Sequence, residues 1–195
     1  MAATLGLLGC AATRLEHTWV KPNLQIQPIR SVVTIALTQN PQRRRAMEEA
    51  LASQLRSEAL MATSSYTTIP EDDIRAEDQV RSHLELGSYD AAIFLRVTDV
   101  TRQDVYVPGR TVAVPVYYQT LWGYYAYWRP IAYEPGYVER DSDVQVETEV
   151  YALPAGDLVY SAVSRTLNPT SSTDLVNEVG RAVARDLKDK GLILK

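Results

Sequence analysis

The chain has 195 residues, a formal net charge of −4 and a single cysteine. This length suits one domain with a substantial hydrophobic core. One cysteine excludes an internal disulfide framework and a paired-cysteine metal or redox site. The mildly acidic balance argues against nucleic acid as a partner, and no run of about 18 apolar residues could span a bilayer. We therefore do not expect an integral membrane protein.

The cysteine lies near the N-terminus, in a distinctive order of residues. An uncharged apolar run over residues 2–8 leads into Leu7-Leu8-Gly9-Cys10, and polar residues follow soon after. This order resembles a lipoprotein signal peptide that ends in a lipobox. The resemblance implies removal of residues 1–9 and covalent diacylglycerol and acyl chains on Cys10, which together hold a protein stably at a membrane. No positive charge precedes Ala2, so we expect a signal peptide truncated at its start. The alternative is a buried or frayed segment with an incidental thiol.

Residues 10–30 contain Pro22 and Pro28 and show little periodicity, so we interpret them as a lipidated tether. The residues directly after Cys10, Ala11-Ala12-Thr13, include no aspartate. In a Gram-negative envelope this implies an outer-membrane location facing the periplasm. The sequence leaves inner against outer membrane open, because it does not reveal the type of envelope.

The domain proper begins with a β-branched strand over residues 31–37. Asn40 then provides an N-cap before Pro41, and a four-residue apolar repeat predicts a helix over about 41–61. The arginines at 43–45 lie beside Glu48 and Glu49 on this helix. We interpret them as a solvated helix face, with anion binding as the alternative.

Residues 63–69 suggest a second strand, which Pro70 ends. The carboxylates of residues 71–73 would open a second helix that ends near Gly87, where they complement the helix dipole; their spacing fits no calcium loop. His83 on this helix and His17 in the tether are interpreted as surface or packed residues rather than ligands.

The second half of the chain predicts more strands. Residues 91–97 form the most apolar run, typical of a central strand buried on both faces, and strand character continues to Val105. Residues 144–150 alternate valine or threonine with polar residues and pair, through a turn at 154–157, with residues 158–166. Glu147 and Glu149 would lie on the wet face, rather than act as an acid/base pair.

A capped amphipathic helix from Ser171 or Ser172 to about residue 190 ends the chain. The elements predict an α+β (mixed α/β) fold in which helices pack on one face of a mostly antiparallel sheet. The expected order is β-α-β-α-β, a β-hairpin insertion, then β-β-α. We expect a single domain over residues 31–195.

An aromatic insertion over residues 107–138 interrupts this domain. We expect an extra hairpin there, formed by residues 111–119 and 124–129 around Gly123. Tyrosine and tryptophan collect both at interfaces and in cores. The sequence leaves these two roles equally open for the candidate contact residues, which are Tyr117, Tyr118, Trp122, Tyr124, Tyr125, Tyr127, Trp128, Tyr133 and Tyr137.

Taken together, Leu7 to Cys10, the strand at 91–97, the aromatic insertion and the hairpin at 144–164 resemble a family of bacterial envelope lipoproteins known only as a domain of unknown function. The fold is also similar to the small α/β domains of TolB N-terminal and transport-auxiliary lipoproteins. The insertion here is richer in tyrosine and poorer in glycine than that pattern. The resemblance implies no catalytic residues.

The function predicted from these features is that of a lipid-anchored periplasmic accessory or structural subunit of an envelope complex. It would contact an unidentified envelope protein and use no cofactor, metal or nucleic acid. No GxSxG, HExxH or glycine-rich phosphate loop is present, so we do not expect an enzyme. The alternative is a periplasmic binding module for a small ligand or glycan, which would stack on the Tyr/Trp-rich insertion.

Overall fold

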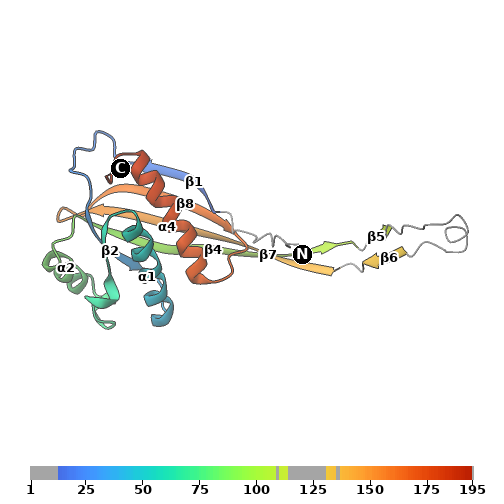
Figure 1. The fold of residues 1–195 in the computed structure, drawn as a ribbon. Coiled ribbons are helices and arrows are strands. Elements are labelled where there is room, and N and C mark those ends of the chain that lie inside the picture. The colour runs from blue at the N-terminus through green and yellow to red at the C-terminus, as the bar shows by residue number, and fades with distance from the viewer. Residues whose placement is uncertain (1–12, 109, 114–130, 135–136, 195) are drawn as a thin grey trace, which may run out of the picture. The chain divides into compact units, whose positions relative to one another are not determined.

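A computed structural model describes residues 13–108, 110–113, 131–134 and 137–194 (Figure 1). The chain divides into two compact units, residues 1–101 with 142–195 and residues 102–141. The elements in chain order are β1 (Thr13–Val20), β2 (Ser31–Ala36), α1 (Pro41–Ser57), β3 (Met61–Ser64), η1 (Ser65–Thr67), η2 (Asp73–Arg75), α2 (Glu77–Leu86), β4 (Ala91–Val107), β5 (Arg110–Ala113), β6 (Ile131–Glu134), β7 (Tyr137–Ala152), β8 (Asp157–Leu167) and α4 (Ser172–Asp189).

A six-stranded mixed sheet with the order β1-β8-β7-β4-β2-β3 forms the centre of the first unit. Strand β2 runs parallel to both β3 and β4, whereas β8 runs antiparallel to both β7 and β1. The α+β class predicted from the sequence is confirmed. The parallel pairs arise because α1 and α2 each return the chain to the same end of the sheet before the next strand begins.

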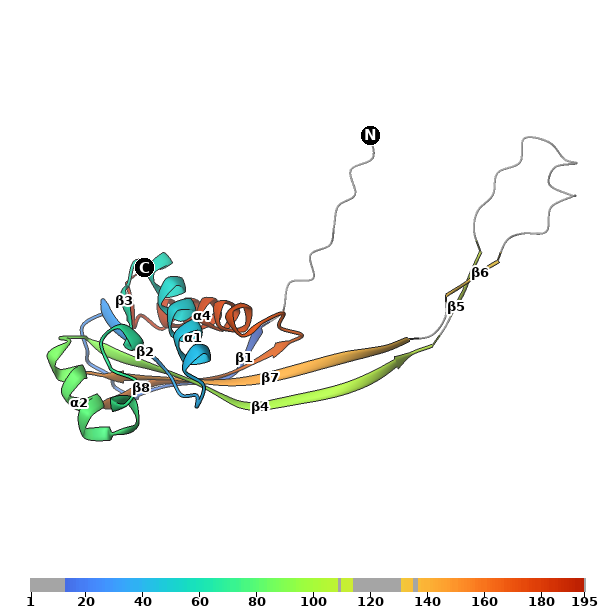
Figure 2. The same ribbon diagram turned by 90° about the horizontal axis from the view of Figure 1, so that it is seen from below.

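The helices cover the two faces of this sheet unequally (Figure 2). Helices α1 and α4 pack on one face; each has seven buried residues, of which five in α1 and six in α4 belong to the main core. On the opposite face, α2 and η2 lie over a small cluster centred on Val33, Ile35 and Ala92. Not one residue of α2 is fully buried. The second face is therefore only partly covered, and by a helix that packs loosely.

The segment expected to be a tether contains a strand instead. Strand β1 pairs antiparallel with β8 from Thr13 to Val20, and the hydroxyl oxygens of Thr13 and Thr166 are 2.7 Å apart. Farther along, Ile29 is buried and forms a bridge with Ile193. The alternation of β1 is interrupted by a bulge between Leu15 and His17, which hides the period of two from a sequence pattern.

The first elements end earlier than the sequence predicted, and the second strand also begins earlier. Helix α1 begins at Pro41, and the side chain of Asn40 caps it, as expected, by accepting a hydrogen bond from the Arg43 amide. The helix ends at Ser57 rather than near 61. Ala59 has φ of +65°, so the chain has already turned into β3. Strand β3 then stops at Ser64, where a 3-10 turn begins.

The second helix also differs from its predicted bounds. Residues 71 and 72 precede a short 3-10 turn, η2, which begins at Asp73, and α2 itself starts at Glu77 and ends at Leu86. Gly87 follows as expected, but with φ of −74°, so it does not use the left-handed conformation that favours glycine at helix ends.

Arg44 corrects the prediction of a solvated arginine cluster. Arg43 and Arg45 are exposed, but Arg44 and Glu48 are each only 1% exposed. The guanidinium of Arg44 donates from Nε to Glu48 (2.9 Å), from Nη1 to Glu71 (3.2 Å) and from Nη2 to Ser65 Oγ (3.0 Å). Glu71 is thus the partner of a buried cation and not a helix-dipole charge.

The hairpin and the last helix agree with the sequence. Strands β7 and β8 pair from Asp143 with Leu167 to Ala152 with Asp157. Val144, Val146, Thr148 and Val150 are buried, as the alternation predicted. The hydroxyl of Ser171 caps α4 by accepting from the amide of Asp174, and one apolar face of that helix is buried. These are the elements with the strictest patterns.

The second unit, residues 102–141, includes the whole of the predicted insertion. Strands β5 and β6 pair antiparallel in it, from Arg110 with Glu134 to Ala113 with Ile131. The first predicted hairpin strand overlaps β5, whereas β6 begins after the second one had been predicted to end. Residues 114–130 lie outside the described residues.

None of the described helices has the length and apolar character needed to cross a membrane.

Candidate functional site: a groove under helix α2

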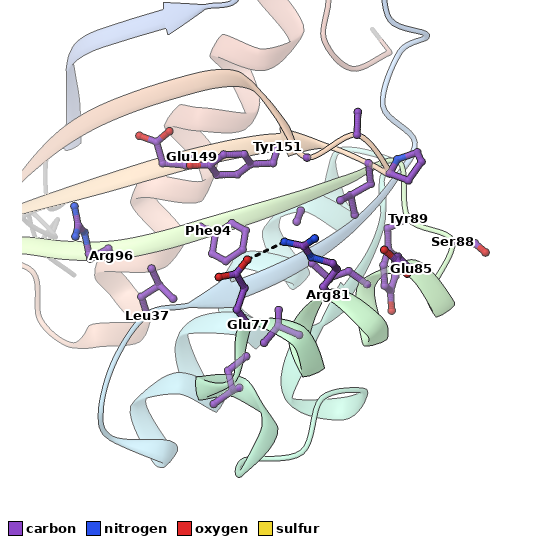
Figure 3. A pocket seen from close by; sticks show the side chains of 18 of the residues that line it. Leu37, Glu77, Arg81, Glu85, Ser88, Tyr89, Phe94, Arg96, Glu149 and Tyr151 are labelled. Atoms are coloured by element: carbon purple, nitrogen blue, oxygen red, sulfur yellow. Dashed lines mark hydrogen bonds and ion pairs between the residues drawn. The ribbon is translucent and has the colours of Figure 1, made fainter.

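One concavity among the described residues is a groove of about 1160 Å³ in the first unit. It lies between α2 and the partly covered face of strands β4 and β7, and the turn that follows β7 closes one end. Figure 3 shows the helix side chains facing those of the sheet across this space. The groove is our candidate functional site.

The groove exists because α2 offers little apolar surface to the sheet. Its sequence contributes Val80 and Leu84, one turn apart, and both are only half-buried. Leu84, Ile74 and Leu153 complete the small cluster on this face. A helix held by so few apolar side chains stays clear of the strands next to it, and the space between them remains open.

Aromatic rings form the floor of the groove. Phe94 of β4 and Tyr151 of β7 meet edge to face, with ring centroids 5.6 Å apart and an interplanar angle of 88°. Tyr89, in the loop after α2, lines the groove beside Glu85. Burial raises the pKa of the Tyr151 hydroxyl, and the negative charges of Glu149 and Glu147 raise it further. The floor is therefore apolar, aromatic and at a negative potential.

Charged side chains line the walls. On the helix, Arg81 donates to Glu77 at 2.8 Å across one turn. On the sheet, Arg96 Nε donates to Glu147 at 3.1 Å. Glu149 accepts a hydrogen bond of 2.8 Å from Ser161 on β8. Glu147 and Glu149 therefore lie on the face opposite the valines, as predicted, but they line the groove rather than an open solvated surface.

The groove combines ion pairs, carboxylates and aromatic rings. The carboxylates of Glu77 and Glu147 each form an ion pair, and the one lining serine, Ser88, has no histidine among the other lining residues that could act as its base. His83 contacts Asp73 at 3.1 Å, and this pair links α2 to η2. Among the described residues, no group of three or more His, Cys, Asp or Glu side chains could hold a metal ion. What the groove offers is rings and carboxylates in one concavity.

Most of the sequence-predicted site residues fall elsewhere. Cys10 and the aromatic residues from 117 to 128 lie outside the described residues. Tyr133 lies on β6, where its backbone pairs with Thr111, and Tyr137 begins β7. No local pattern indicated that Phe94 and Tyr151 would meet, because they lie far apart in the chain and are brought together by the pairing of β4 with β7.

Solved structures similar to this chain include a bacterial lipoprotein and a bacterial protein that forms a dodecamer. The dodecamer is PelC from Paraburkholderia phytofirmans. One of its structures is 12% identical over 89% of this chain and 96% of that chain, with a TM-score of 0.48. A second is 13% identical over 95% and 99%, with a TM-score of 0.46.

The lipoprotein is GNA1162 from Neisseria meningitidis, which is 13% identical over 82% of this chain and 99% of that chain, with a TM-score of 0.44. At TM-scores below 0.5, these similarities do not assign a function to the chain. No protein-family model matches the sequence, and no curated protein matches it.

Proposed function

We propose that this chain is a lipid-anchored accessory or structural subunit of a bacterial envelope complex, held at the membrane through Cys10. The observation that carries the proposal is the order Leu7-Leu8-Gly9-Cys10, followed three residues after the cysteine by the first strand of the folded unit. An acylated Cys10 would therefore attach directly to an edge strand of the sheet. The mature protein would face the periplasm, most simply from the outer membrane.

The proposed role is non-catalytic. The groove places rings and carboxylates together but no serine or cysteine beside a histidine, and the lone cysteine would carry lipid. Binding is the activity that such a surface supports. In this proposal, the aromatic insertion provides the contact with an envelope protein, because nine tyrosines and tryptophans between positions 117 and 137 exceed what a connection between two strands requires.

Anchoring is tested by fractionating cells that express the parent chain, Cys10→Ser or the matched control Ala11→Ser. We expect the parent and Ala11→Ser in the membrane fraction, with the mass of acyl chains on the N-terminal peptide. Cys10→Ser should be soluble or unprocessed. Equal membrane association of all three proteins, with no added lipid mass, would refute the anchor.

Partner contact is tested by shortening the insertion where the structure permits it. Ala113 of β5 pairs with Ile131 of β6, so a two-residue Asn-Gly turn can replace residues 114–130 and close this hairpin directly. We expect the shortened protein to remain folded and lipidated but to lose its partner in pull-downs from detergent-solubilised membranes. Retention of every partner would refute the contact role, and unfolding would show that the insertion is part of a core.

The second candidate is a periplasmic binding module for a small ligand or glycan. The density of aromatic side chains in the insertion favours it, since aromatic faces stack on sugar rings. The same shortened protein discriminates between the two functions. Loss of glycan binding on an array, with partner capture unchanged, would favour this candidate over the accessory subunit.

A further inference from the structure

We propose that the groove under α2 binds a basic, amphipathic peptide segment of a partner protein. This contact is separate from both the lipid anchor and the aromatic insertion, because every lining residue belongs to the first unit. It therefore goes beyond the proposed accessory role and can be tested whether or not that role is correct. The inference depends on charge, on aromatic surface and on size.

The first step is the concentration of negative charge. Four glutamates and two arginines line the groove, so its formal charge is −2. The net charge of the whole chain is −4, and half of it is therefore gathered in one concavity. A concave surface of one sign raises the local concentration of ligands of the opposite sign. This favours a cationic occupant.

The second step is the availability of the carboxylates. Glu77 and Glu147 are paired with Arg81 and Arg96. In contrast, no ion pair is found for Glu85 or Glu149 among the described residues, and the hydrogen bond from Ser161 to Glu149 is neutral. These two glutamates approach the groove from the helix and from the sheet, respectively (Figure 3). Each of them could pair with a different lysine or arginine side chain of a bound segment.

The third step is the floor. A cation over the face of an aromatic ring gains an electrostatic attraction that strengthens when water is excluded. Phe94 and Tyr151 provide rings beside Glu149, and Leu37 adds an apolar side chain that is 50% exposed at the edge of the groove. Apolar and cationic groups would thus be recognised side by side, which is the pattern of an amphipathic basic segment.

The fourth step is size. A volume of about 1160 Å³ exceeds the range of about 300 to 1,000 Å³ that is typical of small-molecule sites. The lining residues of α2 extend from Glu77 to Glu85, which corresponds to about 12 Å of helix. That length matches about two helical turns of a peptide. A peptide segment laid along α2 is therefore a better fit than a single small cation.

The test uses the purified full-length chain in neutral detergent and two fluorescent 12-residue peptides. One peptide is made of leucine and arginine in an amphipathic helical pattern, and the other has glutamate in place of every arginine. Fluorescence anisotropy is measured against protein concentration and against salt. We expect saturable binding of the basic peptide, weakened by salt, and no binding of the acidic one.

Charge reversal in the groove provides the decisive comparison. In E85K/E149K, like charges face the basic peptide, and we expect the Kd to rise by about tenfold or more. The matched control is Glu178→Lys on α4, which packs on the opposite face of the sheet. Single E85K, on an exposed helical position, keeps the test valid should Glu149→Lys lower stability.

Four results would overturn the proposal. One would be a failure of the basic peptide to bind with a Kd below about 1 mM, a value that corresponds to a binding free energy of only about −4 kcal/mol. The two peptides bind equally well. The groove variants and Glu178→Lys change the Kd by the same factor. Sedimentation shows that the groove variants instead abolish self-association, in which case the occupant is a second copy of this chain.

Discussion

The buried pair formed by Arg44 and Glu48 allows a quantitative prediction. Arg44→Met leaves the Glu48 carboxylate buried without its cation, with three neutral donors remaining: the amides of Ala36 (3.1 Å) and Tyr66 (2.7 Å) and the hydroxyl of Ser65 (2.8 Å). Removing one partner of a buried pair costs about 3 to 5 kcal/mol. Because these donors stay in place, we expect the lower end, about 3 kcal/mol.

Glu48→Leu should cost more. It leaves the guanidinium with the partly exposed Glu71 as its only carboxylate, and it removes the acceptor of one buried and one partly buried amide group. A buried amide costs about 1 to 3 kcal/mol when unsatisfied. We therefore expect a loss of about 5 kcal/mol or more. The double variant should not recover the stability of the parent, since the two amides remain without a partner even when both charges are gone.

The assay is urea unfolding of the Cys10→Ser chain, followed by circular dichroism. In thermal unfolding of the same proteins, a loss of about 3 kcal/mol should lower Tm by about 6 to 12 °C for a chain of this size. Arg45→Ala, at the exposed neighbouring position, is the control and should change the unfolding free energy by less than about 0.5 kcal/mol. Equal effects of Arg44→Met and Arg45→Ala would refute the buried pair. Recovery of the parental stability by the double variant would refute the role of Glu48 as acceptor for the two amides.

Three further predictions concern single side chains. Thr148→Val should raise the unfolding free energy by about 1 kcal/mol in urea melts, because the Thr148 hydroxyl is buried with no hydrogen-bond partner among the described residues; a loss of stability would contradict this. Gly180→Ala should lower the free energy of unfolding by about 1 kcal/mol, because the new Cβ would lie 3.1 Å from Leu51 and overpacking outweighs the gain in helix propensity. A higher melting midpoint would show that the side chains of α1 can move to make room. Ser64→Ala should raise the pKa of Glu49 in an NMR titration, because the 2.7 Å hydrogen bond from Ser64 is the largest cause of its lowered pKa. The stabilisation that this bond contributes is present above the ordinary carboxyl pKa and is lost as the pH falls through the folded value, and an unchanged pKa would contradict its cause.

The predictable parts of the fold are those whose side chains interact mostly within one element or with the next one. The hairpin of β7 and β8 was predicted because residues 144–150 alternate without a break, and α4 because Ser171 caps a helix with one apolar face. Strand β1 was missed for the opposite reason. Its bulge interrupts the alternation, and its partner β8 lies about 150 residues farther along the chain, so nothing local indicates a strand.

The groove and the buried pair could not be predicted, because both depend on contacts between distant segments. Arg44 is adjacent to two exposed arginines, and only the approach of Ser65 and Glu71 makes its burial possible. Likewise, Glu149 has the pattern of a solvated strand position. It lines a groove because α2 crosses to the face of the sheet that α1 and α4 do not cover.

The early start of β1 sets how far the folded unit can move from an anchored Cys10. Only Ala11 and Ala12 lie between Cys10 and Thr13, so even a fully extended chain spans at most about 11 Å there. An acylated Cys10 would keep the end of this edge strand in a thin layer above the lipid. Confinement of this kind raises the effective concentration towards partners in the same membrane, and a longer linker lowers it. Insertion of ten Gly/Ser residues before Thr13 should therefore preserve lipidation but weaken partner capture, and unchanged capture would show that proximity to the membrane contributes nothing.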